Sequence, residues 1–399
     1  MKILVLGGCG AMGSETTRDL VQTSDFEKIM VADADLAKAQ AYCDTLNDKR
    51  LAAMAVDVTD KNKLIELFAG YDVIANCTPY KFGLIITEAA IAAKRNILDL
   101  GGLYNTPKQL AMDAQAKEAG IVVLLGCGAT PGVTNLMASA AAEQLDEVDE
   151  VQISFATFRS LAPSPGLLDT VLDEFSPGTV RFYYEQGKFI EVPPFAGETA
   201  VDFMPPVGRQ NVYFVPHSET HTLPRFLFGG VNKVTVRGCW RPETMAALKH
   251  YNDVGLLKTD PIKVEGINLA PKAFLRSFFL ANHDTNDQGE WAFYLNVQIF
   301  GSTDGARAHI TYNLDHPRRS EWGQTCTAKV TGIPASIGAQ MLAKGAVKRH
   351  GVVACEACFE PVPFFKELTK RGIHIHERVV TERKWVSPKE AVASEVGGQ

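Results

Sequence analysis

The sequence contains no apolar run that approaches the roughly 18 residues needed for a membrane-spanning helix. It also contains no tract of basic residues, and its formal net charge is −6 over 399 residues. We therefore expect neither a membrane nor a nucleic acid as a partner. Met1 leads directly into an apolar segment, with no charged and apolar leader ahead of it. This start predicts a cytoplasmic protein.

Several easily recognised catalytic motifs are also absent. The sequence has no HExxH, no Walker phosphate loop and no evident Ser-His-Asp ordering. Its eight cysteines are scattered, which in a cytoplasmic chain predicts reduced thiols. Only Cys355 and Cys358 are spaced like metal ligands, with His350, His374 and His376 nearby. Because no second pair accompanies this spacing, we predict no metal site.

A glycine pattern stands at the start of the chain, between an apolar run and a segment suited to a helix. Residues 3–6 predict a buried strand, and residues 14–21 predict a helix. Between them lies Gly8-x-Gly10-x-x-Gly13. In this interpretation Gly8 allows a tight turn, Gly10 lets the backbone approach a pyrophosphate, and Gly13 lets the helix pack close to the strand.

The residues around this loop extend the prediction to a dinucleotide. Ala11 and Met12 belong to the turn whose free N–H groups would hold the anion. A second apolar run, residues 29–32, ends in Asp33, about 20 residues after Gly13. A carboxylate there accepts a hydrogen bond from a ribose 2′-hydroxyl and repels a 2′-phosphate. We therefore predict NAD as the cofactor, with NADP less favoured.

The order of predicted elements indicates an α/β fold in two parts. Up to about residue 135 strands and helices alternate, which predicts an N-terminal Rossmann domain, a doubly wound parallel sheet. After about residue 148 alternating strands with proline-rich loops and few helices predict a second α+β domain with a mixed or antiparallel sheet. The expected divisions are residues 1–135 for dinucleotide binding, 136–330 for substrate binding and dimerisation, 331–350 for a returning helix (335–347), and 351–399 for a C-terminal segment that ends in a loose tail.

Residues just beyond the predicted strands of the first domain are candidate ligand contacts, because open α/β sheets bind ligands at the carboxyl ends of their strands. Asp57 and Val58 are expected to flank an adenine. Further along the chain, the expected contacts on the nicotinamide side are Asn76, Cys77, Thr78 and Pro79. Two more segments, 99–102 and 126–132, follow the next strands.

The second domain supplies a dense polar segment that begins at His217. This histidine is a candidate general base or acid, because its unperturbed pKa is near neutrality. Glu219 is a candidate partner for a substrate ammonium group, and Arg225 for a carboxylate. A solvated loop of polar residues explains the same segment equally well.

Other residues compete for these roles. Asp99, Tyr80 and Lys81, from the first domain, are rival groups for handling a proton or binding an amine. Arg241 is a second candidate anion clamp, although it also suits a solvent-facing position ahead of a helix.

The motifs together resemble the saccharopine dehydrogenase family, most closely its lysine 6-dehydrogenase-like members and next its carboxynorspermidine synthases. The resemblance covers most of the chain. It is carried by the glycine loop, Asn76-Cys77-Thr78-Pro79, Asp99-Leu100-Gly101-Gly102, Gly126-Cys127-Gly128-Ala129-Thr130-Pro131-Gly132, and segments 176–180, 191–195, 220–225 and 331–340.

This resemblance implies a Rossmann domain joined to an inserted catalytic and dimerisation domain, and therefore a homodimer. It implies nicotinamide-dependent oxidation of a carbon–nitrogen bond, or reduction of an imine. By the same comparison Asp99, Thr130 and the segment from His217 to Arg225 would face the substrate. Saccharopine-forming members often carry Asp where this chain has Thr130, and a signal for NADP where it has Asp33. Both differences disfavour saccharopine itself.

We therefore predict an NAD-dependent amino-acid dehydrogenase that oxidises lysine or a similar diamino acid. His217 or Asp99 would take the proton from the amine. One alternative is a reductive condensation of the carboxynorspermidine synthase or saccharopine-forming type. Another is a Rossmann protein that binds a nucleotide and performs no turnover.

Overall fold

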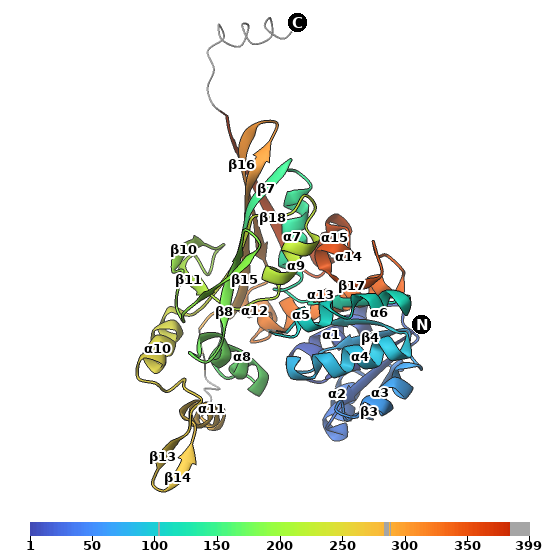
Figure 1. Ribbon diagram of the computed structural model, residues 1–399. Coiled ribbons are helices and arrows are strands. Elements are labelled where there is room, and N and C mark those ends of the chain that lie inside the picture. Colours follow the sequence, from blue (N-terminus) through green and yellow to red (C-terminus); the bar gives the residue numbers. More distant parts are fainter. Residues whose placement is uncertain (103, 283–286, 288, 384–399) are drawn as a thin grey trace, which may run out of the picture.

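The computed structural model describes residues 1–102, 104–282, 287 and 289–383. The loose tail expected from about residue 388 lies outside these residues. Two large sheets organise the described chain (Figure 1). One is wholly parallel and the other is mixed, so the predicted α/β architecture is confirmed.

The first sheet has seven parallel strands in the order β17-β6-β5-β4-β1-β2-β3. Most of these strands are short apolar runs buried on both faces, as expected when helices cover both sides of a parallel sheet. The strands are β1 (Lys2–Leu6), β2 (Lys28–Asp33), β3 (Leu51–Ala55), β4 (Val73–Asn76), β5 (Asn96–Asp99), β6 (Val122–Leu125) and β17 (Gly351–Ala354). Their helices are α1 (Ala11–Thr23), α2 (Leu36–Leu46), α3 (Lys61–Phe68), η1 (Tyr80–Phe82), α4 (Gly83–Ala93), α5 (Thr106–Leu110) and α6 (Asp113–Glu118).

The second sheet has nine strands. Seven follow the order β10-β11-β12-β7-β15-β16-β18, with β8 and β9 paired beside β12. Strands β7 and β12 run parallel, and the other pairs are antiparallel. The strands are β7 (Glu147–Phe158), β8 (Arg181–Glu185), β9 (Lys188–Val192), β10 (Thr199–Asp202), β11 (Arg209–Phe214), β12 (Lys233–Trp240), β15 (Ala292–Thr303), β16 (Ala306–Asp315) and β18 (His374–Glu382).

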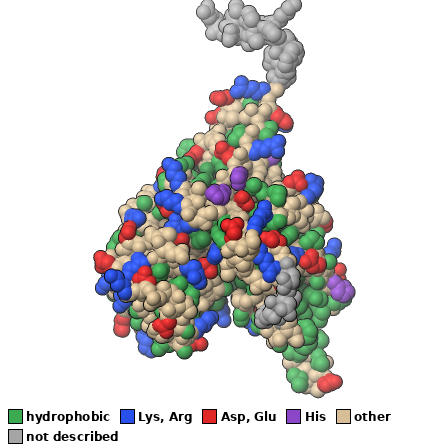
Figure 2. Space-filling view, turned by 180° about the vertical axis from the view of Figure 1, so that it is seen from behind, with side chains coloured by type: hydrophobic (Ala, Val, Ile, Leu, Met, Phe, Trp, Pro, Cys, Tyr) green, Lys and Arg blue, Asp and Glu red, His purple; other side chains and the backbone are tan. Residues whose placement is uncertain are grey.

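Nine helices and one small hairpin complete the described part of the chain after β6. The helices are α7 (Val133–Ala142), α8 (Pro165–Phe175), α9 (Glu219–Phe226), α10 (Pro242–Asp253), α11 (Pro271–Ala281), α12 (Arg319–Trp322), α13 (Cys326–Ala343), α14 (Cys355–Cys358) and α15 (Pro361–Thr369). The hairpin is β13 (Ile262–Val264) with β14 (Ile267–Leu269). With α11 it forms an arm that projects from the molecule and carries exposed apolar side chains, such as Ile267 and Phe278 (Figures 1 and 2).

Helix α8 was not expected, because the prolines near it were interpreted as loop punctuation. Pro165 instead occupies the first turn of the helix, where a missing N–H costs little. Ser164 precedes it, and its side chain accepts a hydrogen bond from Leu167 N at 3.4 Å. Residues 168, 171, 172 and 175 are buried, which is the spacing of one helical face.

Helix α13 begins at Cys326 rather than at residue 335, and it contains Pro334. It lies against α1 with almost no side-chain material between the backbones. A Cβ on Gly332 would lie 2.6 Å from the carbonyl oxygen of Met12. Thr16 completes the contact by donating its hydroxyl to the carbonyl oxygen of Gly332 at 3.0 Å. The helix after the glycine loop therefore rests directly on a segment that is distant in sequence.

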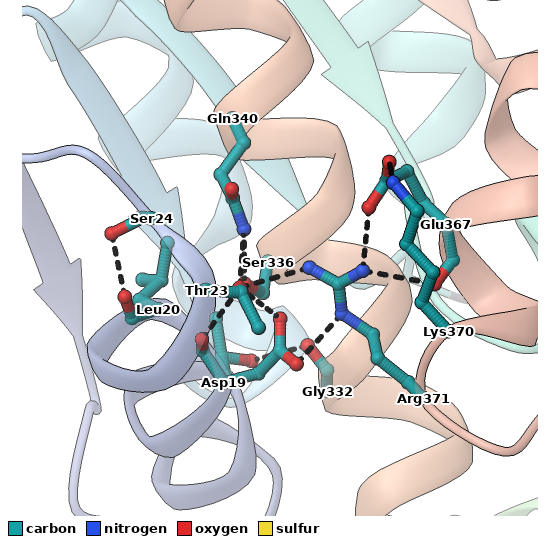
Figure 3. Close-up of polar contacts among 11 residues, drawn as sticks. Asp19, Leu20, Thr23, Ser24, Gly332, Ser336, Gln340, Glu367, Lys370 and Arg371 are labelled. Atoms are coloured by element: carbon teal, nitrogen blue, oxygen red, sulfur yellow. Dashed lines mark hydrogen bonds and ion pairs between the residues drawn. The ribbon is translucent and has the colours of Figure 1, made fainter.

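The C-terminal segment joins both sheets. Strand β17 pairs with β6 in the first sheet, and β18 pairs with β16 in the second. Between them α15 ends near Arg371, which is held in the polar cluster of Figure 3. Arg371 Nε donates to Asp19 Oδ1 of α1 at 2.7 Å, and both side chains are 7% exposed. Nη2 donates to the hydroxyl of Thr23, which also accepts from Gln340 of α13.

We expect Arg371→Met to lower the free energy of unfolding by about 3 kcal/mol, because it leaves a nearly buried Asp19 carboxylate without its cation. Urea unfolding followed by circular dichroism measures this. Lys344→Met is the control, since its ion pair with Asp25 is 3.8 Å long and exposed, and we expect a change below about 0.5 kcal/mol. Equal effects of the two variants would contradict the structural role of the cluster.

Candidate functional site

The glycine loop lies between β1 and α1, at the carboxyl edge of the parallel sheet. The tight turn belongs to Gly7, whose φ is +67°, and not to Gly8 as the sequence suggested. Gly13 has the predicted packing role, since a Cβ there would lie 2.1 Å from Gly7 O. Around Gly10 there is more room, because a Cβ would meet only Gly7 O, at 3.1 Å. The loop therefore leaves open space beside the N-terminus of α1, where Ala11 and Met12 form the first turn.

Asp33 ends β2, which pairs with β1 beside this loop. One carboxylate oxygen accepts from Asp35 N at 3.2 Å and the other from Cys9 Sγ at 3.1 Å. Burial, reinforced by this hydrogen bond, raises the pKa of the Cys9 thiol to about 12. The thiol is therefore a neutral donor that orients Asp33 beside the expected ribose position.

The other expected cofactor contacts also follow strands at this edge. After β3, Asp57 accepts two hydrogen bonds from Thr59 and so closes a turn that includes Val58. At the end of β4, Asn76 Oδ1 accepts from the backbone N–H of Thr78 and from its hydroxyl. Cys77 lies 3.7 Å from the Thr16 hydroxyl of α1, and Pro79 precedes η1. The residues at this edge fit a dinucleotide, because the open space at the glycine loop continues along the residues that follow β2, β3 and β4.

A cleft of about 160 Å³ opens between the two halves of the chain at the same edge. Its walls combine loops of the first sheet with α8 and the start of α9. The lining residues are Tyr80, Leu100, Gly101, Gly102, Thr130, Pro131, Thr170, Glu174, His217 and Ser218. Three predicted site residues, Tyr80, Thr130 and His217, are therefore brought together.

His217 and Glu219 form a buried pair, with Nδ1 and Oε2 2.8 Å apart. The other oxygen of Glu219 accepts from the hydroxyls of Thr130 at 2.6 Å and Thr134 at 2.9 Å. Burial alone would lower the pKa of His217, but Glu219 and then Glu174 raise it overall. Burial opposes the charge on Glu219, yet His217 and Thr130 hold its pKa below the usual value. This arrangement is that of a proton-transfer histidine that lines the cleft and is oriented through Nδ1 by a carboxylate.

Glu174 of α8 is the important lining residue that the sequence analysis missed. It is 2% exposed, and its Oε2 has no hydrogen-bond partner in the described chain. Burial raises the pKa of this carboxyl group to about 7. The serine and proline ahead of α8, followed by the apolar spacing, were the signals that could have located it.

Tyr80 closes the cleft from the other side. Its hydroxyl donates to Asp173 of α8 at 3.1 Å, and Lys272 of α11 pairs with the same carboxylate. Burial, reinforced by Asp173, raises the pKa of Tyr80 to about 12. The neighbouring Lys81 is exposed, with Nζ 4.9 Å from the centre of the Phe82 ring, and does not line the cleft.

Asp99 lies behind the cleft, with its carboxylate occupied by three donors. It accepts from Gly101 N, Gly126 N and Gln109 Nε2, each at 2.8 Å. These bonds hold together the two loops that line the cleft. The glycines there make room for Pro131, since a Cβ on Gly101 or Gly126 would lie 2.7 or 2.5 Å from its ring. The geometry therefore gives Asp99 a positioning role more readily than a role as a base.

The two predicted anion clamps do not line this cleft. Arg241 donates to both carboxylate oxygens of Asp287, at 2.8 and 2.9 Å. Arg225 borders a separate open cavity of about 430 Å³, together with His221 and Phe189. The sequence grouped Arg225 with His217, but His217 precedes α9 and lines the cleft, whereas Arg225 lies in the last turn of α9 and borders the other cavity.

Within the described residues, the structure was searched for metal-ligating groups and for membrane-spanning helices. Residues 1–102, 104–282, 287 and 289–383 contain no group of three metal-ligating side chains, and Cys355 and Cys358 are buried free thiols. In that same part of the chain, no helix combines the length and the apolarity that a membrane crossing requires.

Comparison with known proteins agrees with this geometry. Residues 3–124 match the saccharopine dehydrogenase NADP binding domain, and residues 128–373 match the saccharopine dehydrogenase C-terminal domain. The chain belongs to the saccharopine dehydrogenase family. It is thus an NAD(P)-dependent oxidoreductase of that family, as the resemblance in the sequence predicted.

Two relatives that match nearly the whole chain have names that denote amines. The chain is 26% identical to a carboxyaminopropylagmatine dehydrogenase of Synechocystis, over 95% of this chain and 98% of that protein. It is also 26% identical to a carboxynorspermidine synthase of Vibrio cholerae, over 94% and 96%. The structure of the L-Glu-forming saccharopine dehydrogenase of Saccharomyces cerevisiae superposes with a TM-score of 0.73 at 19% identity, covering 95% of this chain and 99% of the other. That superposition shows the shared fold.

Two glycine variants separate cofactor binding from folding. Gly10→Ala should fold normally but bind NAD at least about tenfold more weakly, because its methyl group would fill the space left for a pyrophosphate. Gly13→Ala should also lower the melting temperature, because its Cβ overlaps Gly7 O. Fluorescence titration and thermal melting measure the two effects. Unchanged NAD affinity in Gly10→Ala would contradict the placement of the pyrophosphate.

Proposed function

We propose that this protein interconverts an imine and an amine at the cleft, using NAD, with a substrate that carries at least two amino groups and a carboxylate. The physiological direction that we favour is reductive: an aldehyde and an amine condense, and the resulting imine is reduced. The names carboxyaminopropylagmatine and carboxynorspermidine each describe an amine with a carboxyl group, which supports this class of substrate.

The observation that carries the proposal is that Glu174 and His217 both line one cleft, and that His217 is held by a second buried acid, Glu219. Glu219 is committed to His217, whereas Glu174 keeps an oxygen free. A carboxyl group whose pKa is about 7 can ionise when a cation binds beside it, since the opposite charge favours the charged form. Glu174 would therefore bind an ammonium group of the substrate, and His217 would face the reacting nitrogen.

The protein's own groups account for the proton. The nicotinamide cofactor supplies or accepts a hydride when bound. His217, protonated through its contact with Glu219, would give a proton from Nε2 to the nitrogen as the carbon–nitrogen double bond becomes single. In the opposite direction neutral His217 would take that proton. Tyr80 and Asp173 would close the cleft over the substrate, which holds the reacting groups in contact.

A second candidate is the oxidative deamination of lysine or a similar diamino acid. Asp33 supports it, because its carboxylate favours NAD over NADP, and NAD suits oxidation. Both candidates use the same cleft and the same proton path. We expect a homodimer in the cytoplasm for either reaction.

One spectrophotometric assay distinguishes the two candidates. Purified protein is given NADH with a carboxyl-bearing semialdehyde, a diamine, or both, and absorbance of the reduced nicotinamide is followed. Consumption only when both are present supports the condensation. Reduction of NAD by lysine at alkaline pH supports the deamination instead. Tight NAD binding with no turnover in either panel would overturn both and leave a nucleotide-binding protein.

Variants of the cleft test the assigned roles. His217→Asn should lower kcat by about 10²–10⁴-fold, as expected for loss of a proton-transfer group. Glu174→Gln should instead raise the KM for the amine by about tenfold, because a neutral amide replaces the partner of the ammonium group. Glu191→Gln, on the exposed face of β9, is the control and should leave both constants unchanged. Equal effects of the first two variants on KM would contradict the separate roles.

Asp33→Ala tests the choice of cofactor. We expect the affinity of the variant for NAD to fall about tenfold, because the ribose 2′-hydroxyl loses its acceptor. The ratio of NADP affinity to NAD affinity should rise, because the 2′-phosphate is no longer repelled by a carboxylate. Fluorescence titration with both dinucleotides measures the ratio. Asp25→Ala, which removes an exposed carboxylate, is the control. An unchanged ratio in Asp33→Ala would contradict the role of Asp33.

A further inference from the structure

The short helix α14 carries a buried carboxyl group that the proposed mechanism does not use. Glu356, between Cys355 and Cys358, is 4% exposed. No hydrogen bond of normal geometry reaches either carboxyl oxygen in the described chain, although Thr222 and Asn135 lie beside the group and favour its charged form. Burying an acid without a partner is costly, so its position calls for a physical reason.

The surroundings of Glu356 connect it to the cleft. Helices α7 and α9 pack against α14, and Asn135 and Thr222 from these helices lie beside the carboxyl group. Asn135 Nδ2 donates to Thr222 Oγ1 at 3.1 Å, and Asn135 Oδ1 accepts from Gly132 N at 2.9 Å. The same two helices carry Thr134 and Glu219, which are themselves hydrogen-bonded. Glu356 therefore packs, through Asn135 and Thr222, against the two helices that carry the Glu219–Thr134 hydrogen bond.

The charges that face Glu356 are few. From α9 the nearest is Glu219; His221 and Arg225 of that helix border the separate cavity. Helix α7, β6 and β17 contain no ionisable residues. Helix α14 itself contributes two thiols. The hydrogen bond with Cys127, followed by burial, holds the pKa of Cys355 well above the usual value, and burial does the same for Cys358, so both stay neutral. Lys348, whose backbone N–H donates to the carbonyl oxygen of Cys358, is the cation that acts on that thiol. Cys127, beside Cys355, is the third thiol.

Glu219 is the charged group that acts on Glu356 from α9. Burial raises the pKa of Glu356 to about 7, and the negative charge of Glu219 acts in the same direction. Two carboxylates that share a buried site oppose each other's ionisation. An ionised Glu356 would in turn strengthen the hold of the His217–Glu219 pair on its proton.

We propose that Glu356 is a positioning residue that acts through Glu219 and sets the pH range over which His217 keeps its proton. When Glu356 is neutral, Glu219 alone holds the proton on His217. When Glu356 is ionised, two negative charges hold it. This assignment rests on the proposed function of His217, but the charge coupling exists without any substrate.

The test is the titration of the His217 ring, followed by NMR of histidine-labelled full-length protein and assigned by the signal lost in His217→Gln. We expect the midpoint in Glu356→Gln to be about one pH unit lower than in the wild type, the size expected for a buried charge that acts on the pair. Glu356→Met is equally neutral and similar in size, so it should give the same shift. Glu360→Gln makes the same chemical change at an exposed position and should give none.

The outcomes separate this proposal from the proposed function. A midpoint that is the same in the wild type and in both neutral variants would overturn the role of Glu356. A shift in only one of them would also overturn it, because the cause would then be packing and not charge. The titration needs no substrate, so it tests the role of Glu356 even if the protein shows no turnover. If turnover is found, the pH profile of kcat should move with the His217 midpoint.

Discussion

The burial of the Glu219 carboxylate is the constraint on which the site depends. A charge that is fully removed from water needs partners, and it finds them in His217, Thr130 and Thr134. Thr130 and Thr134 flank the end of the loop that leaves β6, whereas His217 and Glu219 come from the region of α9. The carboxylate also lies in the first turn of α9, where the helix favours negative charge. Satisfying one buried acid thus ties the second domain to the edge of the parallel sheet.

The first domain and the C-terminal part of the chain are also held together by unusually close backbone contacts. Gly332 lets α13 approach α1, and Gly13 lets α1 approach its own loop. Arg371 adds an ionic contact between α1 and the C-terminal segment (Figure 3). The glycine loop is therefore fixed from behind by a helix and a salt bridge that come from the far end of the chain. These contacts fix the conformation of the loop that would bind the dinucleotide.

Much of the parallel sheet could be predicted from the sequence, because its strands are short apolar runs that alternate with helices and end in polar residues. The positions of Asp33 and Asn76 followed from the same rule. Helix α8 was missed because prolines were interpreted without regard to Ser164 and the apolar spacing after it. Glu174 was missed for the same reason, because it lies in α8. The start of α13 was misplaced because the segment from Thr331 to Pro334 was interpreted as the lead into a helix, whereas the helix begins at Cys326 and continues through Pro334.

The sequence by itself determined the family, the parallel sheet and the strand-end residues, because hydrophobic period and glycine spacing are local properties. Tertiary structure alone decided which polar residues meet. His217 and Arg225 are close in sequence, yet a helix separates their directions, and only His217 enters the cleft. Glu174, Glu219 and Glu356 come from three helices and are all buried, but their environments differ because only Glu219 is paired with His217 and two threonine hydroxyls. Burial and proximity to charge are set by packing between distant segments, and these two quantities fix how an acid ionises.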